Sequence, residues 1–147
     1  MDVDRNAPVV AEARITVAAE PDVVWAAIAD LERWPAWNPD VESMSLDGPV
    51  AEGTTFRWKA GPSTITSTLR SVDPPREIGW TGRAVGIEAV HVWRFEASDG
   101  QTLAITAESW AGRLPRLLRG PMRKQLQKAL DAGLPSLKAE AERRTAA

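Results

Sequence analysis

Apolar and polar residues alternate along most of the chain, which is the pattern of half-buried β-strands. The first such segment covers residues 11–18, where Ala13, Ile15 and Val17 alternate with charged or hydroxyl-bearing side chains. Six further alternating runs cover residues 41–47, 54–60, 64–72, 76–82, 86–98 and 101–110. Short turns rich in Gly, Pro and Asp separate the later runs, so we expect an antiparallel meander.

Two segments have helical periodicity instead. The first begins at Pro21, which suits the first turn of a helix, carries apolar residues such as Ile28 at helical spacing, and ends near Pro35. From Leu118 onward, apolar residues recur at helical spacing, with a kink expected at Pro135. The order predicts an α+β fold, in which a long C-terminal helix lies across an antiparallel sheet of about seven strands.

Composition and charge narrow the function classes. The chain has 147 residues, no cysteine and a net charge of −2, which fits one domain over 1–147, with an ordered core over about 10–143. This charge disfavours a nucleic-acid partner, and the lack of cysteine excludes disulfides and thiolate nucleophiles. No apolar run is long enough to span a bilayer and no signal peptide is evident, so we expect a cytoplasmic protein without integral membrane association.

The single histidine, His91, lies in one of the alternating strands and shares a face with Trp93 and Phe95. A histidine among large aromatics has three interpretations. It is a buried structural residue, a polar anchor inside an apolar binding cavity, or a catalytic base.

The dipeptide Asp99–Gly100 indicates how this strand pairs with the next one. Asp-Gly between two alternating runs is the strongest short signal for a two-residue hairpin turn. The resulting register places His91 directly opposite Glu108, with Trp110 on the same face. A loop one residue longer would turn Glu108 outward and bring Ile105 beside His91. We favour the Asp-Gly register.

In this register a carboxylate lies opposite an imidazole in an apolar wall. His91 and Glu108 could then act as a general acid–base pair for enolisation or dehydration. They could instead anchor a ligand hydroxyl or carbonyl, or form a buried pair without any ligand. We favour the ligand anchor.

Tryptophan is unusually frequent, with seven in the chain against two phenylalanines and no tyrosine. Trp58, Trp80 and Trp93 lie on successive strands and can share one concave face, while Trp37 could lie at a cavity mouth. A wall of indoles suits a flat polycyclic or isoprenoid ligand. The alternative is a tryptophan-rich core.

A basic segment over residues 113–128 contains six basic residues and no acidic one. Such a run is commonly the solvated face of a helix. It could also steer an acidic partner, such as a carrier protein contacting Arg113, Arg116, Arg119 and Arg123, or an anionic ligand head group.

Several stretches together resemble a known family. They are "VVWAAIADLERWPAWNPDV", "GTTFRW", "VDPPREIGWTG", "HVWRFE", "DGQTLAITAESW" and "LPSLKAEAERR". In this order, over roughly residues 10–143, they resemble the START-like (SRPBCC) superfamily, and within it the polyketide cyclase/dehydrase type. The resemblance implies a helix-grip fold, in which two short helices follow the first strand and a curved sheet wraps the C-terminal helix around an apolar cavity.

Members of this superfamily bind sterols, lipids, hormones and polyketides, and a minority catalyse cyclisation or dehydration. The cyclases commonly use cavity residues that include tyrosine, which this chain lacks. We therefore expect binding of a small hydrophobic molecule, such as a lipid, isoprenoid or polyketide-like compound, without cofactor or metal. The alternatives are a polyketide cyclase/dehydratase that uses His91 and Glu108, and a docking module that uses residues 113–128. The residues expected to line the cavity are Trp37, Phe56, Trp58, Trp80, His91, Trp93, Phe95, Glu108, Trp110, Met122 and Leu126.

Overall fold

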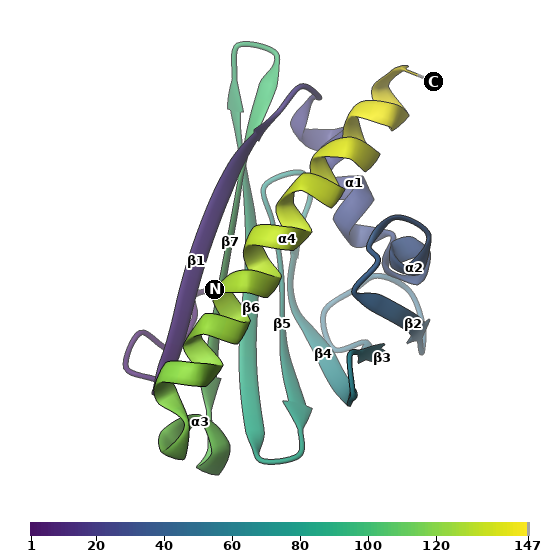
Figure 1. Cartoon of the computed structure of the whole chain (residues 1–147). Helices are drawn as coiled ribbons and strands as arrows, with labels where there is room; N and C mark the ends of the chain where they lie inside the picture. The colour runs from purple at the N-terminus through teal and green to yellow at the C-terminus, as the bar shows by residue number, and fades with distance from the viewer. Residues whose placement is uncertain (147) are drawn as a thin grey trace.

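The computed structural model describes residues 1–146 and contains one antiparallel sheet crossed by a long helix (Figure 1). The strands are β1 (Val9–Val17), β2 (Val41–Leu46), β3 (Thr55–Ala60), β4 (Ser63–Asp73), β5 (Glu77–Ala84), β6 (Ile87–Ser98) and β7 (Gln101–Ala111). The helices are α1 (Pro21–Ala29), the 3-10 turn η1 (Leu31–Arg33), α2 (Trp34–Trp37), α3 (Arg113–Leu117) and α4 (Arg119–Ala146). All seven predicted strands are present, and the predicted first helix is divided at Asp30 into α1, η1 and α2.

The seven strands follow the order β1-β7-β6-β5-β4-β3-β2, and every neighbouring pair is antiparallel. Strand β1 extends the meander of β2 to β7 at its β7 edge, where it pairs with the last strand of the chain. Helix α4 lies against the concave face and contacts β1 and α1 (Figure 1). This arrangement confirms the expected α+β helix-grip fold.

The β6–β7 hairpin has the predicted Asp-Gly turn. Asp99 and Gly100 both have positive φ, at 50° and 77°, as a two-residue turn between twisted strands requires. Ser98 therefore pairs with Gln101, and His91 pairs with Glu108. The predicted register is confirmed, and the alternative with a longer loop is wrong.

Helix α4 turns one apolar stripe toward the sheet. Its buried residues recur about every four positions, which matches the helical period. They are Met122, Leu126, Leu130, Leu134, Leu137, Glu140 and Ala141. The stripe was expected to start at Leu118, but that residue lies just before the helix and is 48% exposed.

The interior consists of two main apolar clusters along the concave face. The larger one lies under α1, α2 and the C-terminal half of α4, and includes Trp80, Trp93 and Leu137. The smaller one lies under the N-terminal half of α4, where Met122 and Leu126 pack against β1. The polar residues of β6 and β7 lie between these two clusters.

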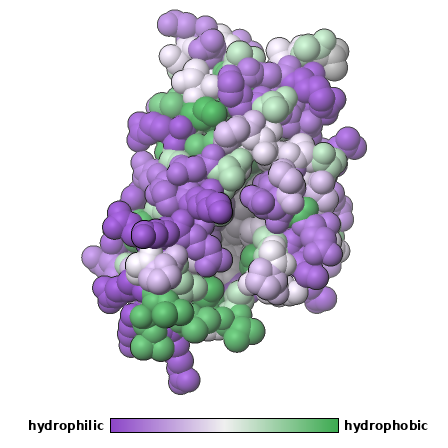
Figure 2. Space-filling view, viewed as in Figure 1, coloured by the Kyte–Doolittle hydropathy of each residue, from purple (hydrophilic) through white to green (hydrophobic). Residues whose placement is uncertain are grey.

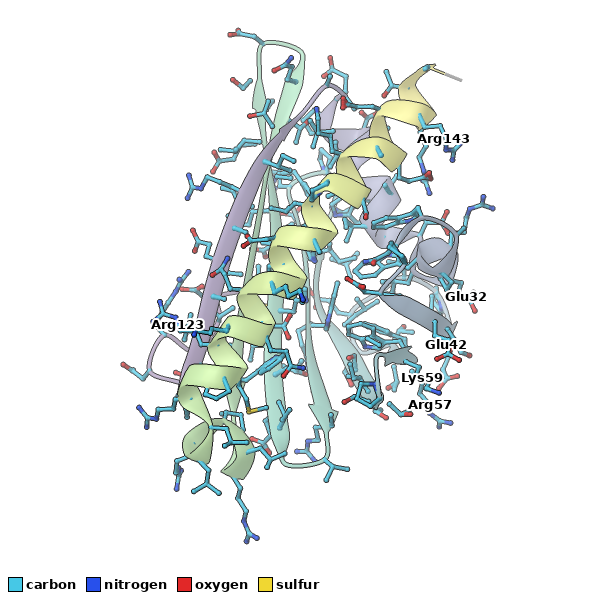
Figure 3. All side chains as sticks on the ribbon, viewed as in Figure 1. Glu32, Glu42, Arg57, Lys59, Arg123 and Arg143 are labelled. Atoms are coloured by element: carbon cyan, nitrogen blue, oxygen red, sulfur yellow. The ribbon has the colours of Figure 1, made fainter. Side chains whose placement is uncertain are left out.

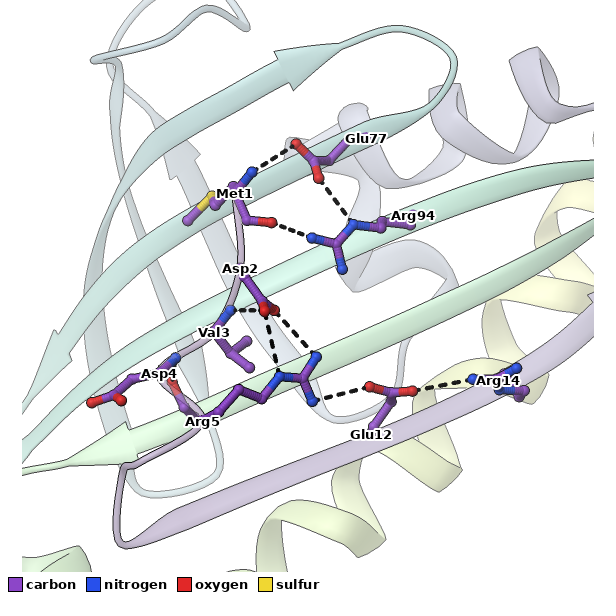
Figure 4. Close-up of polar contacts among 10 residues, drawn as sticks. Met1, Asp2, Val3, Asp4, Arg5, Glu12, Arg14, Glu77 and Arg94 are labelled. Carbon is purple, nitrogen blue, oxygen red and sulfur yellow. Dashed lines mark hydrogen bonds and ion pairs between the residues drawn. The ribbon is translucent and has the colours of Figure 1, made fainter.

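The opposite, convex face of the sheet is partly covered by the first residues of the chain (Figure 4). Val3 is buried against Val92 and Ala107, and the Asp4 amide donates to Ser109 Oγ at 3.0 Å. Arg5 forms ion pairs at the rim of this contact (Figure 4). The first residues of the chain thus cover the convex face at β6 and β7.

Within residues 1–146, none of the helices combines the length and the apolar character that crossing a bilayer requires.

Candidate functional site

A chain of polar contacts crosses the concave face between the two apolar clusters. His91 comes from β6, and Thr106, Glu108 and Trp110 occupy alternate positions of β7, so all four share this face. His91 Nε2 lies 2.7 Å from Thr106 Oγ1, and His91 Nδ1 lies 3.0 Å from Glu108 Oε1. Trp110 Nε1 donates to Glu108 Oε2 at 2.5 Å. We call these four residues the polar chain.

Both nitrogens of the His91 ring face protein groups. The contact with Glu108 is within reach of a hydrogen bond, although the ring N–H is not aligned with the carboxylate and Nδ1 has no other partner. Nδ1 and the carboxylate are therefore in close polar contact without an aligned hydrogen bond. With Nδ1 facing the carboxylate, the Thr106 hydroxyl can donate to Nε2. His91 therefore has no free nitrogen for a ligand unless Thr106 is displaced.

Glu108 is the more accessible member of the central pair. Its side chain is 15% exposed, against 8% for His91. The imidazole is enclosed by aromatic rings, with the Trp80 centroid at 5.0 Å and the Trp93 centroid at 5.5 Å. A carboxylate has about four acceptor positions, and only two are used here, one on each oxygen. Glu108 thus keeps acceptor capacity for a further hydroxyl or amine.

The concave face is lined by small side chains beside the polar chain. Ser67, Gly82 and Ala89 are direct neighbours on β4, β5 and β6, and Phe56 and Trp110 flank them on β3 and β7. We call these three residues the small-residue floor. Ser67 and Gly82 are buried, whereas Ala89 is half-buried, so the row is open only toward β6. Figure 2 shows the molecule hollowed beside α4, on the side of β2 and β3.

The floor is closely fitted at Gly82. A Cβ atom at this position would lie 2.8 Å from Ser67 Oγ and 3.4 Å from Ile65 Cγ2. Ser67 Oγ is held by Trp58, whose Nε1 donates to it at 3.1 Å. Trp58 is half-buried and also lines an open depression of about 230 Å³ with Met44 and Lys59.

The aromatic residues form a connected array rather than a simple wall. Trp34 is its centre, with the centroids of Trp37, Trp80 and Trp58 at 5.4, 5.9 and 6.3 Å. Phe56 packs edge to face on Trp80, and both are almost fully buried. One half of the concave face is therefore filled by aromatic packing.

The expected lining residues are consequently divided. Four lie in the filled half, inside the larger cluster, namely Phe56, Trp80, Trp93 and Phe95. Trp37 packs at the edge of that cluster, and Met122 and Leu126 lie with Trp110 in the smaller one. Trp58 packs against the larger cluster, and Trp58, Trp110 and Glu108 are the half-buried members of the expected lining besides Trp37.

Two indole N–H groups on this side of the molecule are buried without a hydrogen-bond partner among the residues that the structure describes, those of Trp37 and Trp93. Buried donors normally have partners, so these two N–H groups are unsatisfied. By contrast, Trp25 and Trp34 donate to the backbone oxygens of Glu77 and Ile28, both at 2.9 Å.

Several residues of this region were not predicted as site residues. Thr106 lies opposite Trp93 in the predicted register, but its contact with His91 depends on the side-chain rotamers. Ser67 and Gly82 become neighbours only through the β4–β5 pairing, which contains an irregularity between Leu69 and Ser71. Over residues 1–146, no group of three or more His, Asp or Glu side chains is placed to hold a metal ion.

One known protein family matches most of this chain. The family model described as "polyketide cyclase / dehydrase and lipid transport" matches residues 8–142. No curated protein matches the chain significantly.

Solved structures share the fold over most of its length. The Zhui aromatase/cyclase from Streptomyces sp. R1128 is 23% identical, with a TM-score of 0.82. The aligned region covers 92% of this chain and 94% of the Zhui chain. A START superfamily protein from Mycobacterium smegmatis is 15% identical, with a TM-score of 0.79 and coverages of 91% and 97%. The di-domain aromatase/cyclase StfQ from the steffimycin pathway is 20% identical, with a TM-score of 0.76. The aligned region covers 95% of this chain and 52% of the StfQ chain. At these identities the likeness shows the fold alone.

Proposed function

The chain belongs to the polyketide cyclase/dehydrase and lipid transport family, and we propose that it binds a small, largely apolar molecule carrying a hydroxyl group between the sheet and α4. The observation that carries this proposal is the polar chain, which places an under-used carboxylate on an otherwise apolar face. The small-residue floor and the hollow beside α4 supply the space (Figure 2).

The proposed pose follows from the free hydrogen-bonding groups. The apolar body of the ligand lies over the floor, between Trp58 and Trp110. Its hydroxyl donates to Glu108, while His91 and Trp110 hold that carboxylate in place. A hydrogen bond to a charged group is worth about 1.5–3 kcal/mol, enough to favour an oxygenated ligand over a hydrocarbon. Ligands of this kind include oxygenated lipids, isoprenoids and aromatic polyketides.

Tryptophan fluorescence tests whether this face takes up a ligand. Titration with an environment-sensitive naphthylamine dye should quench the protein fluorescence saturably, because Trp58 and Trp110 border the proposed site. Trp58→Phe should reduce the quenched fraction. Trp25→Phe is the matched control, because its indole is engaged with Glu77 elsewhere. Absence of saturable dye binding to the folded protein would contradict the proposal.

A second candidate function is cyclisation or dehydration of a polyketide-like substrate, favoured by the 3.0 Å contact between His91 and Glu108. The similar fold of an aromatase/cyclase supports it. In this mechanism Glu108 would accept a proton from an acidic carbon beside a carbonyl, and His91 would stabilise the carboxylate. Thr106 occupies the other ring nitrogen, so Glu108, not His91, would meet the substrate.

Binding and catalysis differ in the expected effect of Glu108→Gln, which keeps the size and removes the charge. Catalysis predicts turnover of a model polyketone thioester that this variant loses, while its affinity for the substrate is retained. Simple binding predicts no turnover by either protein and weaker affinity for a hydroxylated ligand.

A further inference from the structure

An exposed apolar surface lies at one end of the molecule, beside the β5–β6 turn. It comprises Val85, Leu117, Leu118 and Leu114, which are 92%, 79%, 48% and 38% exposed. We call these four residues the apolar tip. Figure 2 shows it as a hydrophobic area at the lower end, over α3 and the β5–β6 turn. Four large aliphatic side chains together in water are unusual and mark a binding surface.

The two halves of the apolar tip are joined by direct packing. The Leu114 amide donates to the Gly86 carbonyl oxygen at 3.3 Å. A Cβ atom on Gly86 would lie 2.8 Å from Leu114 Cγ, so α3 rests closely on the turn. Gly86 also has a positive φ of 76°, which favours glycine here. The apolar tip is therefore one fixed surface rather than two separate loops.

Basic side chains follow the apolar tip along α3 and the N-terminal part of α4. Arg113, Arg116, Arg119, Arg123, Lys124 and Lys128 form what we call the basic rim. All six are exposed, and none takes part in an ion pair within the part of the chain that the structure describes. Other basic residues, such as Arg94 and Arg143, do have carboxylate partners. Figure 3 shows Arg123 beside the N-terminal half of α4.

We propose that the apolar tip and the basic rim bind the surface of a bilayer that contains anionic phospholipids. Aliphatic side chains enter the boundary between head groups and acyl chains, and cations attract the phosphates. Val85 and Leu117 are mostly exposed, which suits a deformable lipid surface. The six exposed basic side chains without carboxylate partners favour an anionic surface.

The apolar tip also lies near the open half of the concave face. Strand β7 carries Glu108 and Trp110 and leads through Gly112 directly into α3. Helix α4 then places Met122 against the same cluster as Trp110. A hydrophobic ligand leaving a bilayer at the tip would reach Trp110 and Met122 first, a route that rests on the proposed function. Attachment to the bilayer itself does not depend on it.

Vesicle flotation tests the attachment with no ligand added. The protein should float with vesicles of equal parts phosphatidylcholine and phosphatidylglycerol, and not with pure phosphatidylcholine. Leu117→Ser should weaken binding about tenfold, and Arg119→Glu about fivefold or more, since each basic residue near such a surface contributes about fivefold. Leu117→Met and Arg57→Glu are the matched controls and should bind like the original protein. Arg57 is exposed on β3, three strands away from β6 in the sheet order (Figure 3).

Three results would overturn the proposal. The first is failure to bind the anionic vesicles, and the second is an equal loss for Arg57→Glu and Arg119→Glu. The third is retention on an immobilised acidic peptide, abolished by Arg119→Glu, without vesicle binding, which would assign the surface to an acidic protein partner. Dye titration of the concave face is a separate readout, so failure of one proposal is distinguishable from failure of the other.

Discussion

The contact between His91 and Glu108 should couple the stabilities of variants at these two positions. His91→Phe keeps a flat ring between Trp80 and Trp93, but removes the contacts with Glu108 and Thr106. Glu108→Leu removes the partner of His91 Nδ1 and of Trp110 Nε1. Each single change therefore leaves at least one polar group on the concave face without its partner.

The size of the effect follows from burial. A buried polar group that loses its partner costs about 1–3 kcal/mol. Glu108 keeps 15% of its side chain exposed, so each single variant should lose about 1–2 kcal/mol, in the lower part of that range. The double variant removes both partners of the contact together, and should lose less than the sum by about 1 kcal/mol or more.

Urea unfolding followed by far-ultraviolet circular dichroism measures these differences without relying on the tryptophans beside His91. The control cycle is Lys59→Ala with Glu42→Ala, an ion pair at 3.4 Å with side chains 44% and 66% exposed. An exposed pair of this kind should couple by less than about 1 kcal/mol. Additive losses for His91 and Glu108, with unchanged m-values, would refute the reasoning, because the two side chains would then not stabilise one another.

Three further substitutions test other parts of the structure by the same unfolding assay. Gly82→Ala should destabilise the protein by about 1 kcal/mol, because the added Cβ would displace the Ser67 hydroxyl from Trp58; no loss would contradict the close fit. Gly133→Ala, inside α4 with no atom near the added Cβ, should raise the unfolding free energy by about 0.5–1 kcal/mol, and a loss would show that the site is crowded. Arg143 and Arg144 hold the pKa of Glu140 at about 2, below its ordinary 4.5, so its contribution is present above about pH 4.5 and is lost as the pH falls toward 2. Glu140→Gln should therefore cost about 2 kcal/mol at neutral pH and flatten the pH dependence in that window, whereas an unchanged acid profile would contradict this assignment.

Local sequence rules were sufficient for the hairpin that carries the polar chain. Asp99–Gly100 determined the turn, and the turn placed His91 opposite Glu108. The helical period located α4 to within one residue of its start, although it assigned Leu118 to the buried stripe. These features depend on neighbours close in sequence, so periodicity and turn chemistry describe them well.

Features that depend on several strands could not be predicted. The small-residue floor combines Ser67, Gly82 and Ala89 across three strands, and the β4–β5 pairing contains an irregularity that no local pattern indicated. The division of the aromatics depends on Trp34, which packs against both Trp58 and Trp80. Exposure at the apolar tip was equally hidden, since a leucine in a sequence does not show whether another element covers it.

The most direct test of the proposed function compares two ligands that differ by a single hydroxyl group, naphthol and naphthalene, by fluorescence titration of the original protein and of Glu108→Leu. The wild-type protein should bind naphthol at least about tenfold more tightly than naphthalene, since a hydrogen bond to a carboxylate is worth about 1.5–3 kcal/mol. Glu108→Leu should lose this preference and keep its affinity for naphthalene, because the apolar floor and the flanking indoles are unchanged. Equal binding of the two ligands by the original protein, or a preference that survives in Glu108→Leu, would contradict the assignment of Glu108 as the anchor.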